Sequence, residues 1–244
     1  LGMTMGEETE GDHMRRVIAV ASCIVLAVPL SGCTVGSGDI VTETRAVEGF
    51  DKIDLRGTGE VRITVDGTES LEIEAEDNII DRLTSEVSGS TLILSADRPI
   101  RPTEDIIYTV TMASLEGIEI SGSGAIEVSE FSTEDFSVDV SGSGAASVSD
   151  VAAESVFVRI SGSGTVTISG DADDIDLSIS GSGSFDGERL AVDIGDVDIS
   201  GSGSATVNVS ELLDVGVSGS GNVEYVGNPS VSVDSSGSGS VSKR

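Results

Sequence analysis

The sequence predicts a single all-β domain, a β-solenoid whose stacked parallel coils each contain about 18 to 22 residues. Three observations predict this fold. The tetrapeptide SGSG occurs seven times at nearly constant spacing, apolar and polar residues alternate on both sides of each copy, and the two glycines of each copy fall on the same phase as the apolar residues.

The seven SGSG units follow one another at intervals of 18 to 20 residues. They begin at Ser121, Ser141, Ser161, Ser180, Ser200, Ser218 and Ser236. A fixed period near 20 residues indicates a solenoid, in which each strand pairs with its equivalent in the next coil about 4.8 Å away. Seven such coils would span about 34 Å.

The alternation continues through each SGSG unit without a break. Counting by twos through Val138, Val140, Gly142, Gly144 and Ala146, the glycines take the same phase as the apolar side chains. Side chains at i and i+2 point to the same face of a strand, so we expect both glycines to face the interior. A tight corner needs residues without side chains and with unusual dihedral angles, and glycine meets both needs. Each SGSG unit is therefore predicted to be a corner and not a flexible linker.

The region before Ser121 carries a less regular form of the same pattern. Residues 53–65 repeat the phase, with Arg56-Gly57-Thr58-Gly59 standing in place of SGSG. The distance from Arg56 to Ser121 leaves room for about three slightly longer coils, and no second domain is expected. Within this region the patterns predict strands at 71–75, 91–96 and 106–112 and a turn or short helix at 78–83.

The N-terminus predicts export and lipid attachment. Residues 14–32 have a positive start followed by an apolar run, and Leu30-Ser31-Gly32-Cys33 is similar to the lipobox that precedes a lipidated cysteine. The acidic residues 1–13 have the wrong charge for a signal and are interpreted as an upstream start-site artefact. We expect residues 33–49 to be the anchor and a short linker, and residues 50–244 to be the solenoid domain. A plain signal peptide with an incidental Cys33 is the alternative.

Composition limits the classes of function. The chain has a formal net charge of -30, which disfavours nucleic acid and anionic lipid surfaces as partners and favours cations and basic surfaces. Removal of the predicted signal takes away His13 and Cys23, and lipidation would consume Cys33. Without these residues the mature chain can build no Ser-His-acid triad, thiol nucleophile or typical zinc site. A polysaccharide-active enzyme with paired carboxylates stays open as an alternative.

Two outward-facing features are candidate binding sites. Asp176, Asp196 and Asp214 each lie four residues before a corner, with Asp198 two residues after Asp196. If equivalent positions stack, these carboxylates form a column that suits a hard cation such as Ca²⁺, or else a solvated acidic face. Phe157 is predicted to point outward, either as a contact residue or packed beneath a loop.

The segment "IEISGSGAIEVS" and the ending "SGSGNVEYVGNPSVSVDSSGSGSVSKR" resemble the bacterial head GIN domain family of autotransporter adhesins. The resemblance covers residues 50–244. It implies a right-handed β-solenoid at the cell surface and brings no catalytic residues. We therefore expect a non-enzymatic, membrane-anchored bacterial surface lipoprotein that presents an acidic, serine-rich face to an extracellular or cell-surface macromolecule. A structural or envelope-sensing protein without a discrete ligand is a further alternative.

Overall fold

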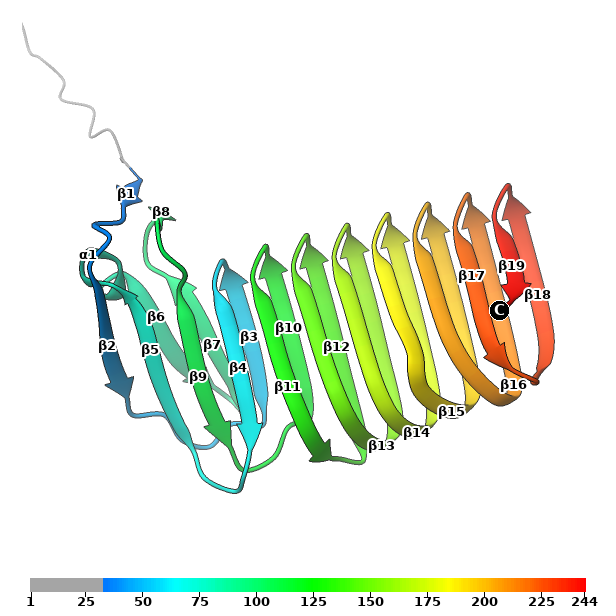
Figure 1. Ribbon diagram of the computed structural model, residues 1–244, viewed down its shortest axis with the longest axis horizontal. Coiled ribbons are helices and arrows are strands. Elements are labelled where there is room, and N and C mark those ends of the chain that lie inside the picture. The colour runs from blue at the N-terminus through cyan, green and yellow to red at the C-terminus, as the bar shows by residue number, and fades with distance from the viewer. Residues whose placement is uncertain (1–32) are drawn as a thin grey trace, which may run out of the picture. The chain divides into compact units, whose positions relative to one another are not determined.

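Two β-sheets run the length of the molecule and face each other across one apolar core, as the computed structural model shows for residues 33–244 (Figure 1). The chain crosses from one sheet to the other at each SGSG corner. We call them the entering sheet, whose strands run into the corners, and the leaving sheet, whose strands run out of them. The predicted signal peptide, 14–32, and the predicted artefact, 1–13, lie outside the described residues.

The strands of the regular coils pair in parallel with their equivalents in the next coil. In chain order they are β10 (Gly117–Gly122), β11 (Ala125–Ser132), β12 (Asp135–Gly142), β13 (Ala145–Gly162), β14 (Thr165–Gly181), β15 (Ser184–Gly201), β16 (Ser204–Gly219), β17 (Asn222–Gly227), β18 (Ser230–Gly237) and β19 (Ser240–Lys243). From β13 to β16 one long strand bends round the corner opposite SGSG, so that its two ends lie in different sheets. The predicted solenoid is confirmed, with about six turns.

The residues before the regular coils form an N-terminal cap. Its elements are β1 (Thr34–Val35), β2 (Ile40–Arg45), β3 (Lys52–Gly57), β4 (Glu60–Val65), β5 (Ser70–Glu76), α1 (Asp77–Ile80), β6 (Leu83–Ser88), β7 (Thr91–Ala96), β8 (Ile100–Arg101) and β9 (Ile107–Met112). The predicted strands and the short helix are all present.

The expectation of three further coils is wrong for the outer part of this cap. β3 and β4 do form a coil that pairs in parallel with β10 and β11, and β7 and β9 pair in parallel with β3 and β4. Beyond them β5, β6 and β2 run antiparallel to their neighbours. The antiparallel strands close the left end of the stack in Figure 1, where another parallel coil would leave a further edge.

The core consists of columns of identical or similar side chains stacked along the solenoid. One column, directly before the corners, comprises Ile120, Val140, Ile160, Ile179, Ile199 and Val217, all buried. Each member pairs in register with the next, so the column continues from coil to coil. Burial of such apolar side chains is the main favourable term in folding.

The corners differ from the prediction at the first glycine of each unit. The second glycine is buried as predicted in every unit except the last, where Gly239 is partly exposed, and a Cβ on Gly164 would lie 2.5 Å from Cγ1 of Val140 in the coil before. The first glycine is not buried. It has a φ between +119° and +134° in all seven units, and a Cβ on Gly162 would lie 2.6 Å from the carbonyl oxygen of Gly142. The first glycine therefore turns the chain, which ends the simple alternation there.

Candidate functional site

The three predicted aspartates lie side by side on the outer face of the entering sheet. Asp176 pairs with Asp196, and Asp196 pairs with Asp214. Asp198 follows in the next outward column, between Ser178 and Gly216. The predicted register is therefore confirmed. The segments that carry these side chains are held by parallel ladders on both sides, so the column is a rigid feature of the sheet.

Electrostatics in this aspartate column are repulsive. The pKa of Asp196 is raised above its usual value, first by partial burial and then by the negative charges of Asp198, Asp176 and Asp214. Among residues 33–244, no three His, Cys, Asp or Glu side chains come together in a way that could hold a metal ion. The carboxylates are thus spread along a sheet, and Ca²⁺ binding there stays a prediction.

Phe157 belongs to the same ladder, directly beside Asp176. Its side chain is 44% exposed, so the alternative in which a loop covers it is wrong. An exposed aromatic ring next to the carboxylate of Asp176, at the end of the aspartate column, suits a cationic group, which can contact the ring face and that acid together. The two site features predicted separately are therefore neighbours on one surface.

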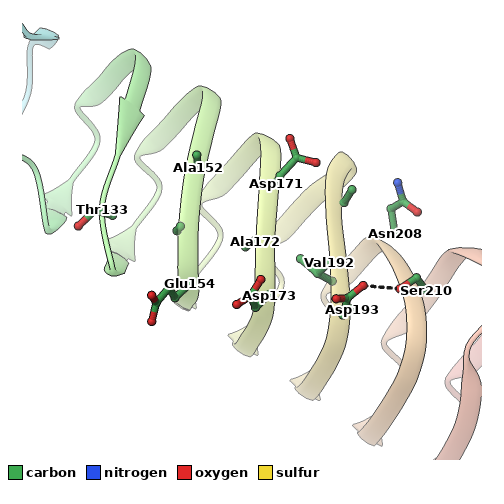
Figure 2. A pocket seen from close by; sticks show the side chains of 12 residues that line it. Thr133, Ala152, Glu154, Asp171, Ala172, Asp173, Val192, Asp193, Asn208 and Ser210 are labelled. Atoms are coloured by element: carbon green, nitrogen blue, oxygen red, sulfur yellow. Dashed lines mark hydrogen bonds between the residues drawn. The ribbon is translucent and has the colours of Figure 1, made fainter.

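A shallow groove of about 500 Å³ lies beside the corner opposite SGSG and is lined by residues of five successive coils, from Thr133 to Ser210 (Figure 2). Its small apolar residues are Ala152, Ala153, Ala172, Ala191 and Val192. Its polar residues are Thr133, Glu154, Asp171, Asp173, Asp193, Asn208 and Ser210. We call this feature the acidic groove.

Carboxylates recur along the acidic groove with the spacing of the coils. The pairings on either side place Glu154, Asp173 and Asp193 at equivalent positions of three successive coils. In the fourth coil Ser210 occurs in their place and donates a hydrogen bond from Oγ to Oδ1 of Asp193 at 2.7 Å (Figure 2). No basic residue lines the groove. It can therefore accept a row of cationic groups over a smooth alanine floor.

This groove was not among the predicted sites. The sequence holds two signals for it. Acids crowd in Gly170–Asp176, of which Asp171 and Asp173 line the groove, and Glu154, Asp173 and Asp193 each lie seven residues before an SGSG unit. The alanines that form its floor resemble ordinary strand residues. The alignment of the carboxylates therefore follows the repeat period, but the period does not show that the residues beside them leave a groove.

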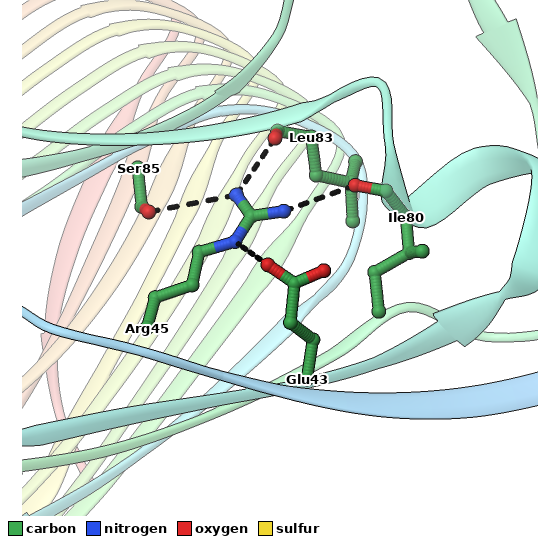
Figure 3. A network of polar contacts seen from close by, with 5 residues as sticks. All are labelled: Glu43, Arg45, Ile80, Leu83 and Ser85. Atoms are coloured by element: carbon green, nitrogen blue, oxygen red, sulfur yellow. Dashed lines mark hydrogen bonds and ion pairs between the residues drawn. The ribbon is translucent and has the colours of Figure 1, made fainter.

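A polar network closes the cap between the two sheets (Figure 3). The guanidinium of Arg45 donates to the carbonyl oxygens of Leu83 at 2.7 Å and Ile80 at 3.0 Å, and its Nε lies 2.9 Å from Oε1 of Glu43. Arg45 ends a strand of the leaving sheet, whereas Leu83 begins a strand of the entering sheet. This side chain therefore ties the sheets together at their outer end.

The segment that follows Cys33, predicted to be the anchor and a short linker, contains β1 and β2, which pair with strands of the cap. Thr34 pairs with Ile100 in β8, and its N–H donates to the carbonyl of Pro99 at 3.1 Å. Glu76, which is 1% exposed, accepts hydrogen bonds from the N–H groups of Gly38 and Thr103. These bonds, with one from the Thr103 hydroxyl, hold the pKa of Glu76 below its usual value despite burial. Cys33 itself is exposed.

The comparisons with known proteins agree with this architecture. A family model described as "Putative auto-transporter adhesin, head GIN domain" matches residues 49–229, and the chain belongs to this family. The resemblance seen in the sequence is thereby confirmed. No curated protein matches the chain. In the described part, residues 33–244, no helix is long and apolar enough to cross a membrane.

Three solved structures have a similar fold. A "putative adhesin" from Bacteroides fragilis is 26% identical with a TM-score of 0.81, covering 86% of this chain and 99% of its own. A "putative lipid binding protein" from Parabacteroides distasonis is 21% identical with a TM-score of 0.72, covering 87% of this chain and 100% of its own. A second protein from that species, a "putative adhesin", is 22% identical with a TM-score of 0.68, covering 87% and 100%.

Proposed function

We propose that this protein is a non-enzymatic adhesion module of the bacterial cell surface, and that its acidic groove binds a basic segment of an extracellular macromolecule. The observation that carries the proposal is the row of Glu154, Asp173 and Asp193, one carboxylate per coil, over an alanine floor. The family description and the similar "putative adhesin" from Bacteroides fragilis support the same class of function.

The physical basis is charge complementarity over a rigid surface. Acids outnumber bases strongly in the regular coils: from residue 117 to 244 there are 21 Asp and Glu against 4 Lys and Arg. The negative electrostatic field of these residues steers basic partners toward the groove and disfavours acidic partners. Lysine or arginine side chains of the partner would pair with the carboxylates, and their aliphatic stems would lie on the alanines. Binding should therefore weaken as salt increases.

Purified residues 33–244 should be applied to arrays of extracellular matrix proteins and glycans. We expect binding to basic proteins, a loss of about tenfold or more in affinity for the double variant Asp173→Asn/Asp193→Asn, and no change for the control Asp234→Asn, which is exposed outside the groove. Equal affinity of the double variant and the parent would contradict the groove as the site. Release of new reducing ends from any polysaccharide would contradict the non-enzymatic assignment.

The proposal includes a lipid anchor at Cys33. The motif Leu30-Ser31-Gly32-Cys33 and the exposure of Cys33 support it. Because the next residue, Thr34, is already paired with β8, an anchored domain would sit directly on the membrane with the cap toward it. We expect Cys33→Ala to release the protein from membranes or to block its processing. Mass spectrometry of the native protein that found an unmodified Cys33 would overturn the anchor.

A further inference from the structure

The corner at Gly57 is the first of the stack, so no equivalent corner packs against its outer side. At every SGSG unit the first glycine packs on the corner of the coil before, but a Cβ on Gly57 would meet no atom within 4 Å. The chain that leaves β7 does not turn at this place. Instead it continues outward through Arg98 and Pro99 to β8, which pairs with β1. A cavity of about 560 Å³ results, lined by Gly57 and Thr58 on one side.

The walls of this cavity, which we call the cap cavity, combine apolar and basic residues. Leu83, Ala96, Pro99 and Ile100 provide apolar surface. Arg56 and Arg98 also line it, with 54% and 68% of their side chains exposed, so they lie where the cavity meets solvent. A volume between about 300 and 1,000 Å³ with apolar walls and a few polar groups is typical of small-molecule sites.

The arginines are unusual on so acidic a chain. Arg56 pairs with Asp54 at 2.6 Å, and Arg98 lies 3.7 Å from the carboxylate of Asp97. A guanidinium has five N–H donors, so each arginine keeps donors for another acceptor. Asp97 also lines the cap cavity, so two guanidinium groups and one carboxylate lie there, on a molecule that is otherwise strongly acidic.

Tyr108 supplies an independent observation. Its side chain is 1% exposed and lines the cap cavity. Within residues 33–244 its hydroxyl has no hydrogen-bond partner, and burial raises its pKa to about 12. The hydroxyl therefore keeps its proton at physiological pH and can donate. The hydroxyl is not one of the fully enclosed polar atoms without a partner, so it reaches the space of the cavity and can donate to an acceptor bound there.

We propose that the cap cavity binds an anionic amphiphile, with an acyl chain against the apolar wall and headgroup oxygens accepting hydrogen bonds from Tyr108, Arg56 and Arg98. A free fatty acid has this chemistry. The acyl group predicted on Cys33 shares only the acyl chain and neutral carbonyl oxygens, and it is a competing occupant of the same apolar wall. This second occupant is near, because Thr34 donates to the carbonyl of Pro99, which lines the cavity. Binding of a free fatty acid does not depend on the anchor or on the acidic groove.

The test uses residues 33–244, which form one compact unit, with Cys33→Ser to exclude lipidation. Titration with a long-chain fatty acid, followed by calorimetry, should give micromolar affinity, and the alcohol of equal chain length should bind about tenfold more weakly. Tyr108→Phe removes only the hydroxyl and should weaken binding about fivefold. Arg56→Gln/Arg98→Gln should weaken it about tenfold, whereas Arg159→Gln on the regular coils should change nothing. Circular dichroism melts would show that each variant is folded.

Absence of fatty-acid binding to the Cys33→Ser protein would overturn the proposal, and so would equal affinities of the parent, Tyr108→Phe and the double arginine variant. A second arm separates the two occupants. If lipidated protein from membranes no longer binds the free fatty acid, its own acyl chain occupies the cavity. If it binds as well as the unlipidated protein, the ligand is a free amphiphile. Failure of the adhesion assay leaves both results unaffected, because the groove variants lie outside the cavity.

Discussion

The corners at Gly57 and Gly162 have the same backbone conformation but different surroundings. Both glycines have a φ of +123°. Gly162 rests on the carbonyl oxygen of Gly142, whereas Gly57 borders the cap cavity. In the stacked coils, both the dihedral angles and the packing against the preceding corner constrain the first glycine. In the cap, only the dihedral angles constrain Gly57. The cap is stabilised by polar contacts that occur once and do not repeat from coil to coil.

The largest expected effect separates these two corners. Gly162→Ala should lower the free energy of unfolding by about 4 kcal/mol, because a Gly-only conformation costs about 1 to 3 kcal/mol for another residue and overpacking adds about 1 to 3 kcal/mol. Gly57→Ala should cost only the first part, about 2 kcal/mol. Urea unfolding of both variants measures the difference. Equal losses would show that stacking does not constrain the corners.

A somewhat smaller effect is expected in the cap. Arg45→Met should cost about 3 kcal/mol, because it leaves two carbonyl groups, of Leu83 and Ile80, without their charged donor. The control Arg62→Met loses only an exposed pair with Glu60, which should cost less than about 1 kcal/mol. Thermal melts should show this contrast. If Arg45→Met melts like the control, the cap is held by packing alone.

Acid should act in opposite directions on the two regions. The pKa of Glu76 in the cap is lowered from 4.5, so its stabilisation is present at neutral pH and is lost as the pH falls below that value. The pKa of Asp196 in the coils is raised from 3.8, so its protonation on acidification relieves repulsion. Glu76→Gln should flatten the loss of stability below about pH 4.5, measured by melts from pH 7 to pH 3. If the Glu76→Gln variant loses as much stability at low pH as the parent, protonation of Glu76 is not the main cause of that loss.

The smallest effect concerns the aspartate column. Asp196→Asn should raise the melting temperature slightly, because it removes one of several like charges, while Asp234→Asn serves as an exposed control. If the column binds Ca²⁺, millimolar Ca²⁺ should raise the melting temperature of the parent and not that of Asp196→Asn. A calcium response that is the same in both proteins would exclude the column as the site.

The sequence was sufficient to predict those parts of the fold that repeat. The period, the core columns and the register of Asp176, Asp196 and Asp214 all follow from spacing, because stacking in parallel makes equivalent positions neighbours. The role of the first glycine was not predictable from the alternation alone. A glycine has no side chain, so the sequence does not show whether its position faces the interior or the solvent.

The cap and the groove escaped prediction for a different physical reason. The antiparallel pairing of β5 with β9 and β2 depends on which strands, distant in sequence, become neighbours. The alternation of apolar and polar residues is the same in parallel and antiparallel strands, so it does not indicate the direction. The carboxylates of the acidic groove do share the repeat spacing, but alternation does not show that small side chains beside them leave a groove. The contact between Tyr108 and the cap cavity arises because the chain leaves β7 in an unusual direction, which no local pattern indicates.

The near-identity of the corners has a consequence for how the chain folds. Strands with the same sequence pattern can pair one coil out of place at little energetic cost, so the regular coils alone define their order poorly. The antiparallel strands of the cap have unlike sequences, and the Arg45 and Glu76 contacts can form with only one set of partners. We therefore expect folding to begin at the cap and to add coils one at a time toward β19, each new coil using the one before it as a template.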